Sequence, residues 1–301
     1  MHLHIFSQIA LTPIEKKVQF IEKYRNEHSL KILLWAVKLA KSSYFDYINR
    51  KPSESAKKRE RIKGKIMRIW KQSNRIYGAR KIKKVLEKKD ITISERTVGN
   101  YMRQLNIRSV YRTVYRPKRT SSSNDETLVN HLKDETITDP YTHVVTDITY
   151  VYTQKDHWVY QITFMDVMSR QVLHSDVSKK MDDEFVSGNT EKLLKLYPSI
   201  QLVHSDRGSQ YTSKRYRTLL EKNEVIASYS AKGYPYDNAI IESYHASIKR
   251  ECLYLHNIKD LKHAQKLVFS YNFGFYNTQR IHQSLGYLTP NQFIKQLKLT
   301  A

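Results

Sequence analysis

The 301-residue sequence contains a single cysteine, Cys252, and no apolar stretch long enough to cross a membrane. One thiol excludes both an internal disulfide and a zinc finger built on paired cysteines. The longest apolar run in the first third, residues 32–37, is flanked by lysines and is far shorter than the roughly 20 residues of a spanning helix. No leader with a charged and then an apolar segment opens the chain, so we expect a cytoplasmic protein without membrane contact.

Negative charge is also scarce, and it is scarce in only one half of the chain. Lys and Arg number 52 against 29 Asp and Glu, a net charge of +23. Residues 1–120 hold 31 basic and 9 acidic residues, whereas residues 121–301 hold 21 basic and 20 acidic residues. A positive field of this size attracts a polyanion, so the expected partner is nucleic acid. The basic Pro/Ser-rich stretch 116–124 lies where the excess stops, and it is predicted to be a linker.

The first part of the basic half, residues 1–55, shows one possible helix-turn-helix pattern. Apolar residues at helical spacing predict a helix over residues 30–40. A turn should follow, with Ser42 or Ser43 as the N-cap of a second helix over residues 44–50. We therefore expect a small helical segment at this end of the chain.

Residues 56–120 show a clearer helix-turn-helix pattern. A helix is predicted over residues 77–86, which include Arg80, and residues 91–94 interrupt it. Thr92 and Glu95 have the spacing of a capping box, and Ser94 supplies a further cap hydroxyl. In the next helix one face is apolar, and the opposite face carries Arg96, Asn100 and Arg103. Arg and Asn read base edges in a major groove, and the surrounding charge favours this hypothesis over a merely solvated helix.

The neutral half, residues 121–301, alternates between strand and helix patterns. This order predicts an α/β domain, a mixed sheet flanked by helices. The expected strands are 143–152, 158–165, 171–177, 200–203 and 225–229, and the expected helices are 181–197, 213–223 and, after a Gly/Pro loop at 233–235, 238–251.

Three carboxylates occupy unusual places in this pattern. Asp147 lies inside an apolar strand, where an unpaired charge is costly. Asp206 follows directly on a strand and precedes a glycine-containing loop, and Glu242 follows three apolar residues on a helix. Taken singly, they have ordinary explanations: a charge at a sheet edge, a turn residue and a surface acid. Taken together, they offer the hard oxygen ligands that Mg²⁺ and Mn²⁺ prefer.

The residues around these acids carry a resemblance to a known family. The sequences are TDITY at 146–150, HSDRGSQY at 204–211, YDNAIIE at 236–242 and YNTQRIHQSLGYLTP at 276–290, with Lys249 and Glu251 between the last two. They resemble the motifs of DDE transposases, and more narrowly those of the second-frame product of the insertion-sequence-three (IS3) family of bacterial mobile elements. The resemblance extends from about residue 76 to residue 293.

This resemblance implies a ribonuclease-H-like integrase core over residues 121–301, with a helical tail at its C-terminal end. Asp147, Asp206 and Glu242 would be the catalytic triad and the metal ligands for Mg²⁺, as two ions, with Mn²⁺ as a substitute. The implied activity is phosphoryl transfer on DNA: cleavage and joining of element ends. The implied partners are double-stranded DNA, further copies of the chain on that DNA, and the upstream-frame product, in the cytosol of a bacterium.

Other residues near the motifs leave alternatives open. Lys249 lies two helical turns after Glu242, so it either holds a phosphate near the metals or is a solvated lysine. Asp166 is interpreted as structural, and neither His204 nor His282 is required by a metal mechanism. A non-catalytic DNA-binding regulator derived from a transposase is the second hypothesis, and the intact triad argues against it. A retroviral-type integrase would need a His/Cys zinc module, which a single cysteine excludes.

Overall fold

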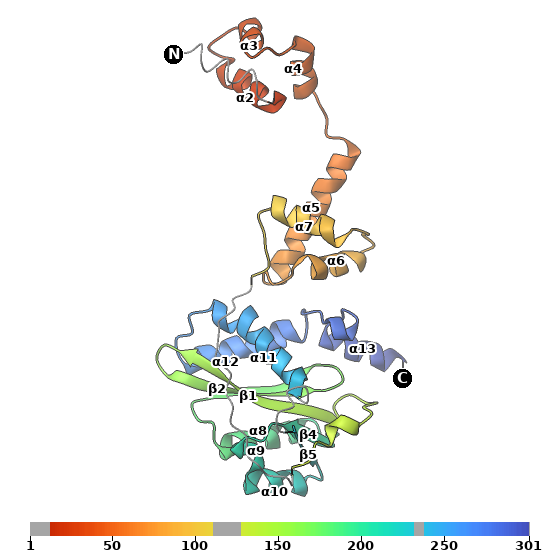
Figure 1. The fold of residues 1–301 in the computed structure, drawn as a ribbon, viewed down its shortest axis with the longest axis vertical. Coiled ribbons are helices and arrows are strands. Elements are labelled where there is room, and N and C mark those ends of the chain that lie inside the picture. Colours follow the sequence, from red (N-terminus) through yellow and green to blue (C-terminus); the bar gives the residue numbers. More distant parts are fainter. Residues whose placement is uncertain (1–12, 111–127, 232–237, 301) are drawn as a thin grey trace. The chain divides into compact units, whose positions relative to one another are not determined.

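The computed structural model describes residues 13–110, 128–231 and 238–300, and it divides the chain into two compact units at residue 64. Each unit is described by itself (Figure 1). The predicted linker 116–124 and the loop 233–235 lie outside the described residues. Within the described ranges, no helix has the length and apolar composition needed to cross a membrane.

Before residue 54, the described part of the first unit contains three short helices, α2 (Ile14–Tyr24), α3 (Leu30–Ala36) and α4 (Lys41–Ile48). Their small core is formed by the buried residues Val18, Ile21, Leu33, Leu34, Val37 and Tyr44. The predicted helices are present, but the predicted cap is wrong. Lys38, with φ 49°, stops the first helix early, and Ala40 is the N-cap of α4. The chain is therefore already helical at Ser42 and Ser43.

The helix α5 (Glu54–Gln72) continues through the boundary between the units, and α6 (Ala79–Glu87) and α7 (Glu95–Gln104) follow it. Buried apolar residues join the three helices: Ile66 and Ile69 of α5, Ile82 and Leu86 of α6, and Val98 and Met102 of α7. The Oγ atom of Ser94 accepts a hydrogen bond from the Thr97 amide at 3.0 Å. The N-cap of α7 is thus Ser94, whose extended backbone directly precedes the helix, and the predicted Thr92–Glu95 capping box is wrong.

The larger part of the second unit is built on a five-stranded mixed sheet in the order β3-β2-β1-β4-β5. The strands are β1 (His143–Thr153), β2 (His157–Asp166), β3 (Val172–Ser178), β4 (Leu202–Ser205) and β5 (Ile226–Tyr229). The first three form an antiparallel meander, whereas β4 pairs parallel to both β1 and β5. The central strand β1 pairs with β2 along its length but with β4 only over residues 143–145, so Asp147 lies just past the end of the parallel pair.

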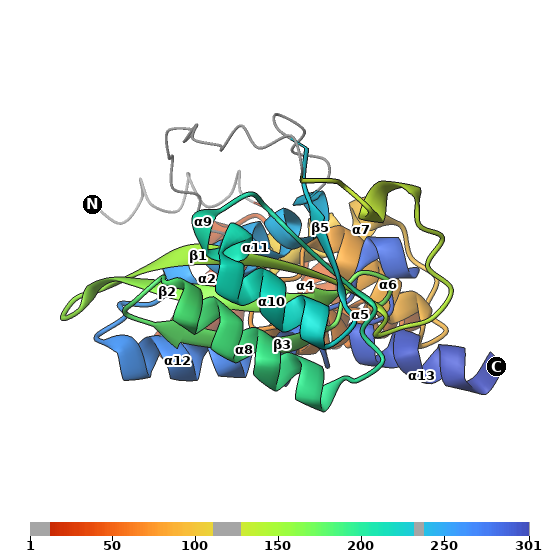
Figure 2. The ribbon, with the colours of Figure 1, turned by 90° about the horizontal axis from the view of Figure 1, so that it is seen from below.

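Helices cover both faces of the sheet (Figures 1 and 2). One face carries α8 (Asp183–Leu196), α9 (Ser209–Thr212) and α10 (Lys214–Lys222), and the other carries α11 (Ala239–Glu251), α12 (Leu261–Phe269) and α13 (Pro290–Thr300). On the α8–α10 side, buried residues such as Ile162, Val186, Leu193 and Tyr216 form the core. A π-helical segment, Ser270–Tyr276, and short 3-10 turns at Leu132–Asp134, Leu253–Leu255 and Gln283–Leu285 complete the chain. The predicted mixed sheet, flanked by helices and preceded by an all-α region, is confirmed.

Candidate active site

Two of the three predicted acids meet because their strands are parallel neighbours. Val145 of β1 is opposite His204 of β4, and each acid lies two residues further along the chain: Asp147 within β1 and Asp206 directly after β4. The two carboxylates therefore emerge beside each other at one edge of the sheet, where ligands bind in open α/β folds.

A glycine lets the loop after Asp206 turn tightly around its carboxylate. The Gly208 amide donates a hydrogen bond to the Asp206 Oδ1 atom at 3.0 Å. A Cβ atom at Gly208 would stand only 3.0 Å from that oxygen and 2.9 Å from the Gln210 Oε1 atom. A side chain here would crowd both groups, so the Gln210 amide or the Asp206 carboxylate would have to shift by a few tenths of an ångström.

The third acid, Glu242, comes from the opposite layer. It lies in the first turn of α11, which is anchored by the buried residues Ile241, Tyr244 and Ile248. The Glu242 side chain is exposed, and the charge that acts on it most strongly is that of Asp147. A strand, a loop and a helix thus direct one carboxylate each toward the same region.

The charge of Asp147 acts on both of the other acids. The Asp206 side chain reaches solvent, yet the protein packed around it removes part of its hydration. This desolvation, followed by the charge of Asp147, raises the pKa of Asp206 to about 6. Desolvation and then Asp147 also raise the pKa of Glu242. As they stand, however, no three acidic, His or Cys side chains in the described part of the chain are close enough to hold one metal ion.

His245 is a site residue that the sequence analysis missed. Its Nδ1 atom lies 3.2 Å from the Asp147 Oδ2 atom, and the Ile148 amide donates to Oδ1 at 2.7 Å. The imidazole is buried, and among the described residues its Nε2 atom has no hydrogen-bond partner. Its position three residues after Glu242, on the same face of a helix, was the available signal.

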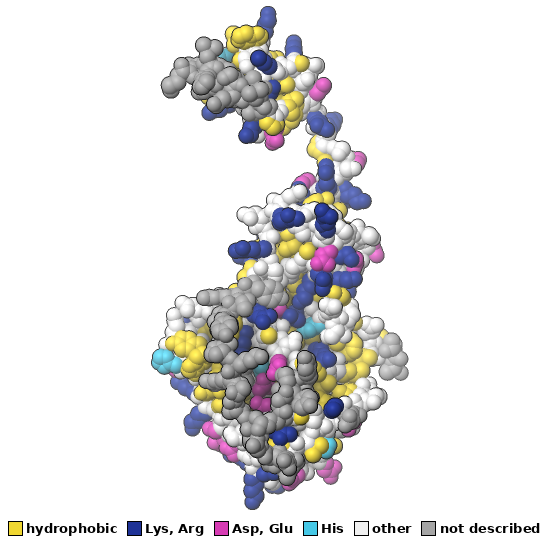
Figure 3. Space-filling view, in the orientation of Figure 1, with side chains coloured by type: hydrophobic (Ala, Val, Ile, Leu, Met, Phe, Trp, Pro, Cys, Tyr) yellow, Lys and Arg dark blue, Asp and Glu magenta, His cyan; other side chains and the backbone are white. Residues whose placement is uncertain are grey.

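A groove with a volume of about 490 Å³ runs along this site. Asp147 and Glu242 line it together with His245, Lys249 and Arg250. Lys249, the residue left open between two interpretations, therefore shares one depression with Asp147 and Glu242, whereas Asp206 is not among the residues that line it. Figure 3 shows acidic side chains grouped in the middle of the core's face.

The predicted DNA-contact residues of the helical region lie on other elements. Arg96 and Arg103 are exposed on α7, and an Arg103 guanidinium nitrogen donates to the Asn100 Oδ1 atom. Arg80 on α6 is also exposed, and its Nε atom lies 3.4 Å from the Glu95 carboxylate. These side chains form a polar surface on the helices, apart from the groove.

The other titratable residues near the motifs have structural surroundings. His204 is fully buried between the hydroxyls of Ser228 and Ser230, at 2.8 and 3.0 Å. Burial and then the Arg280 charge lower the pKa of His282 to about 2. Neither imidazole is therefore placed to exchange protons with DNA.

Asp166 and Cys252 are structural as well. The Asp166 carboxylate is completely buried and accepts hydrogen bonds from the backbone amides of Tyr141 and Ser169, both at 2.7 Å. Cys252 is buried at the end of α11, where burial and then Glu251 raise its pKa to about 12. Its thiol is thus protonated at neutral pH and unreactive.

Comparison with known proteins identifies the class to which this fold and site belong. The integrase core domain matches residues 138–235 and again residues 223–290, and the HTH-like domain matches residues 57–115. An integrase core preceded by a helix-turn-helix region defines a polynucleotidyl transferase that acts on DNA.

Full-length relatives narrow the class to a family. A transposase for the insertion sequence IS904 of Lactococcus lactis is 32% identical over 253 residues, which cover 82% of this chain and 99% of the relative. The transposase InsF of IS3A from Escherichia coli is 28% identical over 282 residues, which cover 92% and 98%. The chain belongs to the IS3 family of insertion-sequence transposases, proteins of DNA transposition and integration. The resemblance seen in the motifs is confirmed.

Among solved structures, the chain is similar to the catalytic core of the BIV integrase, at 18% identity and a TM-score of 0.41, over 53% of this chain and 97% of that one. It is also similar to the HTLV-2 integrase core in complex with magnesium, at 15% identity and a TM-score of 0.40, over 51% and 96%.

Proposed function

We propose that this transposase cuts and joins the ends of its element with Asp147, Asp206 and Glu242 as catalytic carboxylates. The observation that carries this proposal is the position of Asp147 beside the other two acids: desolvation and then the charge of Asp147 raise the pKa of both Asp206 and Glu242. Asp147 thus repels the other two carboxylates, and a bound divalent cation would relieve the repulsion.

The donor set fits Mg²⁺, with Mn²⁺ as a substitute, because both ions take few protein carboxylates and keep positions for phosphate and water. Asp147, Asp206 and Glu242 would be the ligands, for a pair of ions. Bound there, such ions supply a nucleophile at neutral pH and neutralise charge on the attacking and leaving oxygens.

The neighbouring side chains prepare the site for DNA. His245 and the Ile148 amide each hold one oxygen of Asp147, which fixes the direction of that carboxylate. Lys249 and Arg250 line the groove beside the acids, where their charges would attract the DNA backbone. The groove thus combines a cation-binding part with a phosphate-binding part.

Recognition of the element ends is assigned to the helical region. We propose that α7 enters a major groove, that Arg96, Asn100 and Arg103 contact bases, and that Arg80 supports them at the backbone. The functional division is then a helical segment at 1–55, a DNA-binding domain with its linker at 56–120, and a catalytic core at 121–301. The partners are the terminal repeats and target DNA, further copies of the chain on that DNA, and the upstream-frame product.

The substrate for the test is end-labelled duplex DNA that carries the terminal repeat of the element. The sequence of this repeat is taken from the DNA that flanks the gene. The isosteric changes Asp147→Asn, Asp206→Asn and Glu242→Gln each remove a charged ligand and leave the shape almost unchanged. Cleavage and strand transfer should fall to background in each variant, because charge that develops on the oxygens is no longer stabilised. Binding of the same duplex should persist, because it rests on the basic region.

The matched control is Glu221→Gln, which changes an exposed acid on α10 outside the groove and should cut normally. A Glu242→Gln protein that cuts at a near wild-type rate would remove Glu242 from the site. The hypothesis of a non-catalytic regulator predicts a wild-type chain that binds the repeat and never cuts it. The same assay therefore decides between the two functions.

A further inference from the structure

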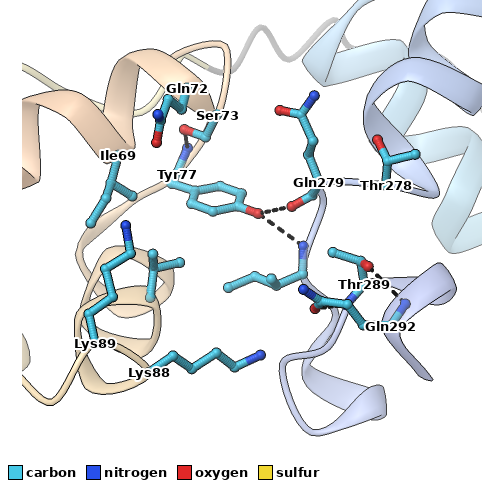
Figure 4. Close-up of a pocket in the computed structure, with 12 residues that line it drawn as sticks. Ile69, Gln72, Ser73, Tyr77, Lys88, Lys89, Thr278, Gln279, Thr289 and Gln292 are labelled. Atoms are coloured by element: carbon cyan, nitrogen blue, oxygen red, sulfur yellow. Dashed lines mark hydrogen bonds between the residues drawn. The ribbon is translucent and has the colours of Figure 1, made fainter. Parts of the chain in front are cut away.

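The C-terminal motif at 276–290 has no role in the carboxylate chemistry, yet the structure gives it a specific contact. Tyr77, just before α6, is buried against this segment. Its hydroxyl donates a hydrogen bond to the Gln279 carbonyl oxygen at 2.6 Å and accepts one from the Ile281 amide at 3.0 Å (Figure 4). One side chain of the DNA-binding region thus bridges two backbone groups of the tail.

The contact continues along one stripe of α6. Lys81, Lys84 and Lys88 follow Tyr77 at helical spacing, and they face the tail. The Lys88 Nζ atom donates to the Tyr287 carbonyl oxygen at 2.7 Å, and the Lys84 Nζ atom lies 5.3 Å from the centroid of the Tyr287 ring. Burial, followed by the Arg280 charge, lowers the pKa of Lys81 to about 8, which marks an enclosed contact.

The tail, residues 276–290, also contacts α11, the helix that carries Glu242. The Arg280 guanidinium donates to both oxygens of Glu251, each at 2.8 Å, and to the Ser247 Oγ atom at 3.0 Å. The Glu251 side chain is completely buried, and Tyr271 donates to it at 2.7 Å. Glu251 and Ser247 both belong to α11, the helix whose first turn carries Glu242. A buried, bidentate pair with further hydrogen bonds holds its geometry tightly.

These contacts form one continuous connection. The helix α7 packs on α6 through buried Val98 and Met102, α6 packs on residues 279–287, and Arg280 joins that segment to α11. We propose that residues 279–287 are a docking surface that fixes α7 relative to α11, with Tyr77 and Arg280 as positioning residues. The distance between the recognised sequence and the phosphodiester that is cut is thereby set by the protein. This inference rests on the proposed function.

The experiment loosens the docking without touching α7 or the acids. Tyr77→Phe keeps the ring and removes only the hydroxyl. Lys88→Met removes the hydrogen bond from the Lys88 ammonium group to the Tyr287 carbonyl oxygen. The controls are Tyr152→Phe, a tyrosine half-exposed on β1, and Lys192→Met, which loses the same charge from an exposed lysine on α8. Arg280 is left unchanged because its removal would leave the Glu251 carboxylate buried and unpaired.

Two measurements on the full-length chain separate docking from chemistry. Hydrogen exchange should be faster at residue 281 and in α6 in the docking variants than in the controls. On end-labelled terminal-repeat duplex, the docking variants should bind like their controls. Their cuts should spread to neighbouring phosphodiesters, and the rate should fall by up to about 100-fold, as expected for reacting groups misplaced by about 1 Å.

Docking variants that exchange faster but still cut at one position and at the wild-type rate would overturn the proposal. Unchanged exchange in the Tyr77→Phe, Lys88→Met double variant would overturn the docking contact itself. A wild-type chain that binds the repeat without cutting it would contradict the proposed chemistry instead. In that case the hydrogen-exchange measurement alone tests the docking contact.

Discussion

The helical region and the integrase core of this transposase use charge in opposite ways. Residues 1–120 carry 31 basic and 9 acidic residues, whereas residues 121–301 are almost balanced at 21 and 20. In the helical region many cations spread over exposed surfaces, and Lys and Arg side chains are visible across it in Figure 3. In the core, three acids gathered at one place carry the proposed chemistry. Under the proposed function, binding of DNA depends on the number of charges, and catalysis depends on their position.

Within the helical region, the basic side chains also differ in their surroundings. Arg96 and Arg103 project from α7 into solvent, whereas Lys81, Lys84 and Lys88 of α6 are directed to the tail. The basic residues therefore fall into two sets, with DNA contact and docking as their proposed roles, and composition alone does not distinguish them.

The largest effect should come from removing the divalent cation, which acts on the core alone. With EDTA, cutting of terminal-repeat duplex should fall to background while binding measured by gel shift persists. Mg²⁺ or Mn²⁺ should restore cutting. Ca²⁺, which is larger and looser in its geometry, should support binding more than chemistry. Full activity in EDTA would contradict a metal mechanism.

The next effect should come from neutralising cations on α5, which acts on the helical region alone. If each contacts one phosphate, three changes to Gln should weaken binding to every sequence and reduce the slope of log K against log salt by about 3. The α5 set is Lys58, Arg59 and Arg61, and the matched exposed core set is Lys192, Lys222 and Lys262. Equal losses from both sets, measured by fluorescence anisotropy at several salt concentrations, would remove the contrast between the two regions.

A smaller and more selective effect is expected on the α7 surface. Changing Arg96, Asn100 or Arg103 to Ala should cost about 1–3 kcal/mol on the terminal repeat if the side chain reads a base. Binding to random duplex should change less, and Gln104→Ala, at an exposed position of the same helix, is the control. Equal losses on both duplexes would mean that these residues contact only phosphates.

The smallest effect concerns stability and follows from Asp206. Because its pKa is raised to about 6, the folded state binds this proton more tightly than the unfolded state does. The contribution of Asp206 to stability therefore falls as pH rises through the range from about 4 to 6. In EDTA, Asp206→Asn should unfold at a higher temperature than wild type at pH 7.5, and the difference should disappear near pH 4. Thermal unfolding at the two pH values measures this difference. An Asp206→Asn variant that unfolds at the wild-type temperature at pH 7.5 would contradict the raised pKa of Asp206.

Much of the fold could be predicted because each element has its own local signal. The β-branched run around Asp147 and the apolar spacing of the helix after Ser94 gave elements close to those observed. The helices α2 and α5 were not predicted, and the other errors lie at helix ends and caps. Ser42 and Ser43 have the side chains of N-caps, but the left-handed backbone at Lys38 moved the start of α4 ahead of them. A cap depends on where the preceding helix stops, and that position is set by packing.

The sequence by itself determined the division of charge, the order of strands and helices, and the three acids with their motifs, since all of these are local in the chain. Three contacts were decided by tertiary structure alone. His245 lies beside the Asp147 carboxylate, and the charge of Asp147 acts on Asp206. The C-terminal tail contacts Tyr77 through its backbone and Glu251 through Arg280. Tyr77 and Gln279 are 202 residues apart, so no local pattern relates them. Such contacts arise only when distant segments share one buried space, where polar groups must find partners.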